Sequence, residues 1–163
     1  MEKQTIVAAA AIAIALSTFD AGGQLASQAP APILKEPYSL GFAEFMIFAQ
    51  IRHSKLWLAG DARNWELADY QVDELKEGLE DAAKHFPTYK EAPVGQMIGA
   101  LMTAPIADLE GAIKARDRPK FVAAFDGLTA ACNTCHQAAN RPFIVIQRPS
   151  TSPFPNQTFA PKR

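Results

Sequence analysis

The stretch WELADYQVDELKEGLEDAAKHF, residues 65–86, carries the clearest helical pattern in the chain. Its apolar residues recur at alternating intervals of three and four, a spacing that gathers them on one face of an α-helix. They are Trp65, Ala68, Val72, Leu75, Leu79, Ala82 and Phe86. The other face is acidic, and Pro87 follows directly. We therefore expect an amphipathic helix over residues 65–85 that buries one face against partner helices.

The same spacing predicts three further helices, over residues 38–59, 93–116 and 119–139. Four amphipathic helices of similar length with short connections are typical of an antiparallel bundle. The sequence thus predicts an all-α protein, an antiparallel four-helix bundle over residues 30–140. A proline-rich, extended tail over residues 141–163 completes the expected architecture.

The expected helix ends carry recognisable boundary residues. Gly60 suits a helix C-terminus, and Asn64 can cap the helix that follows. Asp117 can cap the last helix, with Pro119 in its first turn. Pro105 lies inside the third helical pattern, where it either kinks the helix or makes it start afresh.

Residues 1–29 have the layout of a secretory signal peptide. The run IVAAAAIAIAL, residues 6–16, is apolar and too short to span a bilayer comfortably, and small residues follow it. Glu2 opposes Lys3, so the start is only weakly basic. A buried N-terminal helix is the alternative. We expect cleavage between about Ser17 and Ala29, no lipoprotein anchor, and a periplasmic protein that does not span the membrane after processing.

The charge balance argues against nucleic acid as a partner. Without its first thirty residues the chain has equal numbers of basic and acidic side chains. Nucleic-acid-binding proteins instead carry a basic surplus. The remaining chain is long enough to bury a core without disulfides. With only two cysteines it is not a cysteine-dense exported scaffold.

Those two cysteines lie in CNTCH, residues 132–136. In a helix, Cys132, Cys135 and His136 occupy positions i, i+3 and i+4, so the three side chains project from one face. Two thiols so placed can form thioethers with haem vinyl groups, and the histidine can reach the iron. The pattern is read as a c-type haem attachment site.

Three other kinds of site can contain such a motif. A redox dithiol favours a helix start in a βαβ setting, which this sequence lacks. A structural zinc site needs four ligands, and only His53 and His85 remain to add to the motif. A simple disulfide leaves His136 unexplained. Haem attachment is the favoured prediction, with one covalent haem c expected.

Four helices with CNTCH near the end of the last one resemble cytochrome c′. The layout is also similar to that of the soluble four-helix b-type cytochrome, which lacks the thioether links. The resemblance covers roughly residues 38–139 and leaves the tail unexplained. It implies that His136 is one axial iron ligand. Dimers are common in the family, so the resemblance also allows a homodimer.

The resemblance offers two designs for the opposite side of the iron. One leaves the iron five-coordinate behind an apolar residue of the first helix, and the other supplies a methionine from that helix. Because the first and last helices run antiparallel, Met46 matches this distal position. It is expected as a ligand or as a packing residue. His53 lies two turns further along, roughly 10 Å away, and is the less favoured alternative ligand.

Several further residues are expected near the haem or in the helix packing around it. Arg141 is the preferred partner for a propionate, and Arg52 and Lys55 are weaker candidates. Trp57 and Trp65 are expected in helix packing, and His85 on the surface at a helix end. The apolar segment 143–146 is expected to fold back over the haem edge or a helix groove.

These features predict an exported c-type cytochrome that transfers single electrons to an unidentified redox partner, not an enzyme. The sequence shows no catalytic triad and no acid–base constellation. The alternative is a five-coordinate haem protein that binds a diatomic gas such as NO or CO. A haem subunit of a larger redox complex, docked through the tail, is a third and weaker possibility.

Overall fold

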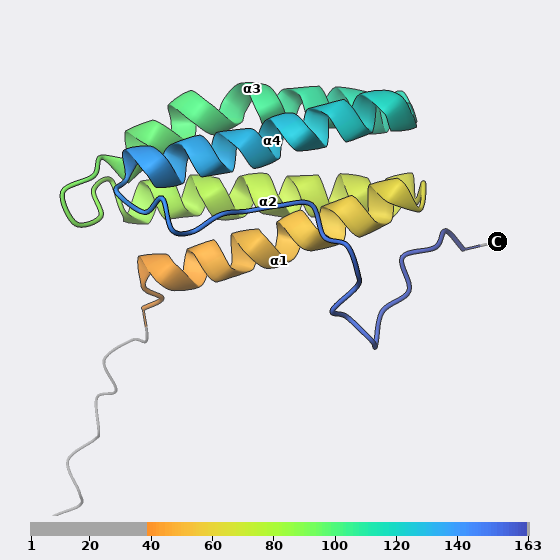
Figure 1. Cartoon of the computed structure of the whole chain (residues 1–163), viewed down its shortest axis with the longest axis horizontal. Coiled ribbons are helices and arrows are strands. Elements are labelled where there is room, and N and C mark those ends of the chain that lie inside the picture. Colours follow the sequence, from red (N-terminus) through yellow and green to blue (C-terminus); the bar gives the residue numbers. More distant parts are fainter. Residues whose placement is uncertain (1–38, 163) are drawn as a thin grey trace, which may run out of the picture. The chain divides into compact units, whose positions relative to one another are not determined.

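The computed structural model describes residues 39–162, in which four helices run alternately up and down and a tail follows (Figure 1). The helices are α1 (Phe42–Asp61), α2 (Trp65–His85), α3 (Val94–Lys114) and α4 (Arg118–Ala138). In this part of the chain, β-type pairing is limited to an isolated bridge between Tyr89 and Ala92 in the α2–α3 connection. The predicted all-α class and four-helix bundle are confirmed.

Two of the predicted capping residues act as expected. The side chain of Asn64 accepts a hydrogen bond from the Leu67 N–H at the start of α2. Asp117 accepts one from the Lys120 N–H at the start of α4. Each bond satisfies a backbone donor that has no partner inside its helix. The local sequence therefore defines where α2 and α4 begin.

Gly60 has a different role from the expected one. It lies inside the last turn of α1, and the left-handed conformation beyond the helix is taken by Arg63, with φ of 59°. A Cβ on Gly60 would lie 2.1 Å from the ring of Phe121 at the start of α4. The missing side chain therefore serves a close approach between α1 and Phe121, not the end of the helix.

Pro105 does not divide α3. The helix runs without a break from Val94 to Lys114, so a fresh start at the proline does not occur. Met102, Ile106 and Leu109 are buried on both sides of it. Their shared burial keeps the two halves in one element, although the proline removes one helical hydrogen bond.

The core is richest in aromatic side chains where α1 meets α4. The rings of Trp57 and Phe125 have centroids 5.0 Å apart, and Phe121 lies beside both. Trp65 contacts Phe121 edge to face. Phe121 and Phe125 are completely buried. Burial of each such ring stabilises the fold by about 1.5–3 kcal/mol, and the expected packing role of both tryptophans is confirmed.

Helices α1 and α4 pack together less extensively than the other neighbouring pairs. The C-terminal tail follows the space between them (Figure 1). Arg148 shows this placement, because its guanidinium pairs with Asp126 of α4 and lies 4.3 Å from the Trp57 ring of α1. Further along, Phe159 is buried in the core and Ala160 accepts a hydrogen bond from Asn64. The tail is thus packed along the bundle.

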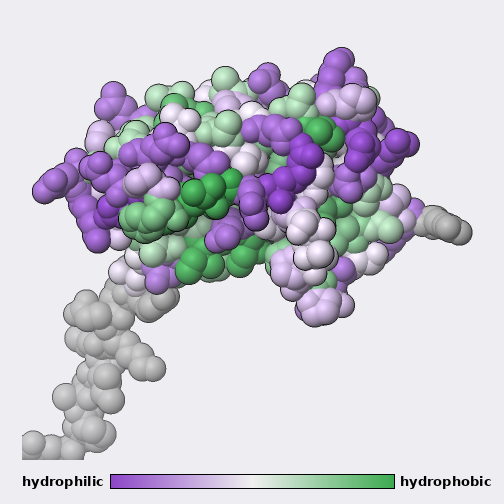
Figure 2. All heavy atoms as spheres, in the orientation of Figure 1, coloured by the Kyte–Doolittle hydropathy of each residue, from purple (hydrophilic) through white to green (hydrophobic). Residues whose placement is uncertain are grey.

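The expected signal peptide, residues 1–29, lies outside the described residues. Between residues 39 and 162, every helix is too short or too polar to cross a membrane. Several large apolar side chains nevertheless reach the surface, and Figure 2 shows apolar atoms among the polar ones on this face. They come from α1, α2 and the tail: Ile47, Phe48, Ile51, Tyr70, Phe143, Ile144 and Val145.

Candidate functional site

A cavity of about 360 Å³ lies in the half of the bundle that contains the start of α1 and the end of α4. All four helices and the first residues of the tail contribute to its walls. The lining is mainly apolar, with Leu79 from α2, and Ile98 and Met102 from α3. A concave, mainly apolar space of this kind is typical of sites that bind small molecules and cofactors.

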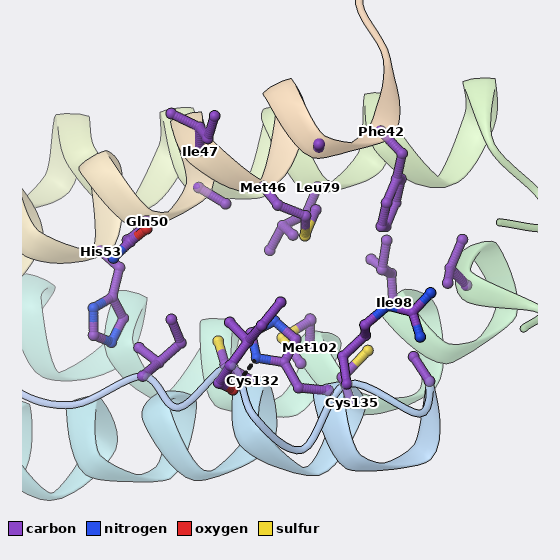
Figure 3. Close-up of a pocket in the computed structure, with 18 of the residues that line it drawn as sticks. Phe42, Met46, Ile47, Gln50, His53, Leu79, Ile98, Met102, Cys132 and Cys135 are labelled. Atoms are coloured by element: carbon purple, nitrogen blue, oxygen red, sulfur yellow. Dashed lines mark hydrogen bonds between the residues drawn. The ribbon is translucent and has the colours of Figure 1, made fainter. Parts of the chain in front are cut away.

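The three chemical groups of CNTCH meet at this cavity. Cys132, Cys135 and His136 all line it from α4, as expected for helical positions i, i+3 and i+4. Both cysteines are partly buried and are not joined in a disulfide. Figure 3 shows the two thiols on the α4 side of the cavity, across from α1. The prediction that the three side chains project from one face of the helix is confirmed.

The protonation of the thiols argues against a redox dithiol. Burial, reinforced by the nearby Cys135, raises the pKa of Cys132 to about 11. Burial also raises the pKa of Cys135 above its ordinary value. Reactive CxxC dithiols have lowered pKa values, commonly at a helix N-terminus, whereas these lie near the C-terminal end of α4. At neutral pH both groups are therefore neutral thiols.

A zinc site is also poorly supported by the ligand positions. A structural zinc ion takes four protein ligands. Among the described residues, no three or more His, Cys, Asp or Glu side chains are grouped so that they could hold a metal ion. The motif would therefore supply only part of a zinc coordination shell.

His136 is oriented by the tail. Its Nδ1 lies 2.9 Å from the carbonyl oxygen of Ile144, and this hydrogen bond is the dashed line in Figure 3. Because a carbonyl can only accept, Nδ1 must carry the proton and act as the donor. The lone pair then resides on Nε2, the nitrogen that remains available to bind a metal.

Met46 lies on the opposite side of the cavity. It projects from α1 next to Leu79 of α2, and Figure 3 shows it across from the two cysteines. Its side chain is half-buried and packs against the core. The antiparallel arrangement of α1 and α4 therefore brings the predicted distal residue to the expected place. Its thioether can serve as a metal ligand or as part of an apolar wall.

His53 is engaged in a structural hydrogen bond. Its Nε2 lies 2.9 Å from the Thr129 hydroxyl, whose own proton is donated to the Phe125 carbonyl. Thr129 must therefore accept, so Nε2 of His53 is the protonated nitrogen. The ring also packs on Phe125, with centroids 4.4 Å apart. Burial lowers the pKa of His53 to about 4, so it is neutral at physiological pH.

The position of His53 also separates it from the cysteine pair. It lines the cavity, but Figure 3 shows it with Gln50 at one end, while Phe42 marks the other end and Met46 lies between them. Its only metal-binding lone pair is on Nδ1. This arrangement favours a structural role for His53 over the less favoured role of iron ligand.

Of the three basic residues predicted as possible propionate partners, one lies at the cavity and two lie elsewhere. Arg141 lines the cavity, and one of its guanidinium nitrogens donates to the Asn140 carbonyl at 2.8 Å. Arg52 is instead ion-paired with Glu74, and Lys55 lies 4.9 Å from the ring of Phe154. Neither Arg52 nor Lys55 lines the cavity. Arg141 is thus the one predicted propionate partner that the fold brings to the site.

Two further expectations concern His85 and the apolar segment 143–146 of the tail. His85 is exposed in the last turn of α2, as predicted. Segment 143–146 does fold back, since Ile144 and Ile146 line the cavity. Phe143 and Val145, however, remain 76% and 70% exposed. Ile144 and Ile146 thus face the cavity, whereas Phe143 and Val145 point to solvent.

Two contributors were missed by the sequence reasoning about the site. Met102 is a second methionine that lines the cavity, and unlike the half-buried Met46 it is buried. Asn133, between the two cysteines, binds the tail through both ends of its amide. No local sequence pattern predicts this contact, because the amide of Asn133 binds the backbone of a residue thirteen positions later.

Comparisons of the chain with protein-family models, with curated proteins and with solved structures found no match.

Proposed function

We propose that this protein is a c-type cytochrome that binds one haem covalently and transfers single electrons. One observation carries the proposal: both thiols and the imidazole of CNTCH line one mainly apolar cavity. A thiol pair and a histidine on a single helical face match the chemistry of c-type haem attachment.

The residues around the cavity fit such a group. The neutral thiols of Cys132 and Cys135 would hold the macrocycle through thioether bonds. The Nε2 lone pair of His136 would bind the iron, and Arg141 would pair with a propionate at the rim. When bound, haem supplies a reversible one-electron couple between ferric and ferrous iron.

The chain itself would control the environment of that couple. The apolar side chains from α1, α2 and α3 would surround the haem with groups of low polarity. A low-polarity surrounding disfavours the additional positive charge of the oxidised state, which raises the reduction potential. Met46 would add a thioether ligand opposite His136, a pairing that raises the potential of cytochromes further.

An exported location belongs to the same proposal. The apolar run of residues 6–16 supports removal of a signal peptide and a periplasmic mature protein. The electron donor and acceptor would then be other exported redox proteins. A homodimer is compatible with this role and is tested by the oligomeric state of the purified holoprotein.

The haem proposal is tested by the double variant Cys132→Ser/Cys135→Ser, produced together with a haem-attachment system. We expect the parent protein to retain haem after acid and denaturant treatment, and the variant to retain none. The mass of the intact protein and the pyridine haemochrome spectrum report this directly. Thr134→Ala, inside the same motif but exposed, is the matched control. A parent protein without covalent haem would sink the proposal.

Gas binding is the second candidate function. The observation that favours it is the apolar character of the wall beside Met46, where Leu79 and Ile47 also line the cavity. If Met46 packs in this wall without binding the iron, a small gas such as NO or CO can occupy the sixth position. The optical spectrum of the ferrous protein with and without CO separates the two candidates.

A further inference from the structure

The tail contacts the helix that carries the CNTCH motif through the side chain of one motif residue, Asn133. Asn133 lies between the two cysteines of CNTCH on α4. Its Nδ2 donates to the Ile146 carbonyl at 2.9 Å, and its Oδ1 accepts from the Ile146 N–H at 2.8 Å. Both backbone groups of a single tail residue are thus bound by one side-chain amide.

This double contact defines the orientation of the amide. An N–H can only donate and a carbonyl can only accept, so a flipped Asn133 would lose both hydrogen bonds. An aspartate could keep only one of them at neutral pH. Asparagine is therefore the short side chain whose two ends match the two backbone groups of Ile146.

The clamp lies two residues beyond the group that His136 contacts. Ile144 supplies the carbonyl that accepts from Nδ1 of His136, at 2.9 Å. Holding Ile146 against α4 therefore limits how far the Ile144 carbonyl can move from the imidazole. Arg148, two residues further along, anchors the same segment through Asp126. The acceptor for the axial histidine thus comes from the tail, secured by Asn133.

We propose that Asn133 is a positioning residue that clamps the tail so that the Ile144 carbonyl holds the His136 imidazole in its Nδ1-protonated orientation. The inference rests on the proposed haem function. When a histidine binds a metal through one ring nitrogen, a hydrogen bond donated by the other nitrogen sets the tautomer of the ring. The same hydrogen bond raises the basicity of the metal-binding nitrogen. The tail, which the bundle resemblance leaves unexplained, would therefore tune the iron from the His136 side.

Asn133→Ala in the full-length holoprotein is the first test. We expect the Ile146 amide to exchange with deuterium at least about fivefold faster, because its acceptor is gone. We also expect a more positive reduction potential. In the Met46→Leu background, where the ferrous iron keeps His136 as its one protein ligand, we expect a lower iron–histidine stretching frequency in the resonance Raman spectrum. Both follow from weaker electron donation by His136.

Matched variants separate positioning from general damage. Thr134→Ala removes the other side chain between the two cysteines, whose hydroxyl donates to the Ala130 carbonyl within α4, and should leave all three signals unchanged. Ile146→Pro removes the donor for Asn133 from the opposite side. The double variant Asn133→Ala/Ile146→Pro should change the stretching frequency less than the two single effects added together, because both break one contact.

The positioning role of Asn133 can be tested separately from the haem proposal. If the parent chain binds no haem, the ¹⁵N chemical shifts of the His136 imidazole still report the tautomer. They should show Nδ1–H in the parent and a mixture of tautomers in Asn133→Ala. Faster exchange at Ile146 with an unchanged tautomer, frequency and potential would overturn the proposal. An equal effect of Thr134→Ala would overturn it as well.

Discussion

At the scale of single residues, Met46 decides which of the two proposed functions the site supports. We expect Met46→Leu to keep the packing, because the two side chains have similar volumes, and to remove the sulfur. A six-coordinate protein would then lose its low-spin ferrous bands and gain CO binding. Met102→Leu is the matched control, since Met102 lines the same cavity from α3. Low-spin bands that persist in Met46→Leu would rule out the thioether ligand.

His53 gives the protein a specific pH dependence. Its pKa is about 4 when folded, because of burial, and 6.5 when unfolded. Between these values the unfolded chain binds a proton that the folded chain does not. The free energy of unfolding should therefore fall as the pH decreases from 6.5 towards 4, by roughly 3 kcal/mol in total.

His53→Gln removes this titration while leaving an amide that can donate to Thr129. Chemical denaturation at pH 7 and pH 4.5 should show a smaller loss of stability in the variant than in the parent. Equal losses would contradict the assignment. The two histidines on α4 and α1 thus play different parts: His136 is held for binding, and His53 is held by Thr129.

At the scale of the helices, the approach of α1 to α4 depends on the absence of a side chain at Gly60. A methyl group there would meet the ring of Phe121, which is completely buried and has no space to move into. We expect Gly60→Ala to lower the free energy of unfolding by about 1–3 kcal/mol through overpacking. Urea denaturation measures this change.

Gly78 provides the comparison within the same bundle. A Cβ on this residue of α2 would meet nothing within 4 Å. Gly78→Ala should therefore raise the free energy of unfolding by about 0.5–1 kcal/mol through better helix propensity. If both substitutions shifted stability in the same direction, the close approach at Gly60 would not be the controlling feature.

At the scale of the whole molecule, the tail belongs to the folded unit. Phe159 is only 9% exposed and packs with the core, near the ring of Phe154. Phe159→Ala should cost about 3 kcal/mol of stability, as for other buried phenylalanines. Phe143→Ala, at an exposed tail position, should cost little. Equal midpoints of thermal unfolding for the two variants would show that the tail folds independently.

The sequence by itself determined the helices and the inward face of α4. The relevant features are local: the apolar spacing of three and four, the capping residues Asn64 and Asp117, and the spacing within CNTCH. The regular geometry of a helix determines from them which residues share a face and where the helix begins. The same regularity predicted Met46 and His53 on one face of α1. These predictions succeeded because each depends on residues within a few turns of one another.

Only the tertiary structure decided the contacts between distant segments. It showed that Gly60 makes room for Phe121, that Arg52 and Lys55 are engaged away from the cavity, and that Thr129 holds His53. It also placed the Ile144 carbonyl on His136. Such contacts depend on how packed helices and an irregular tail meet in space, and an extended segment without periodicity carries no sequence signal for its partner.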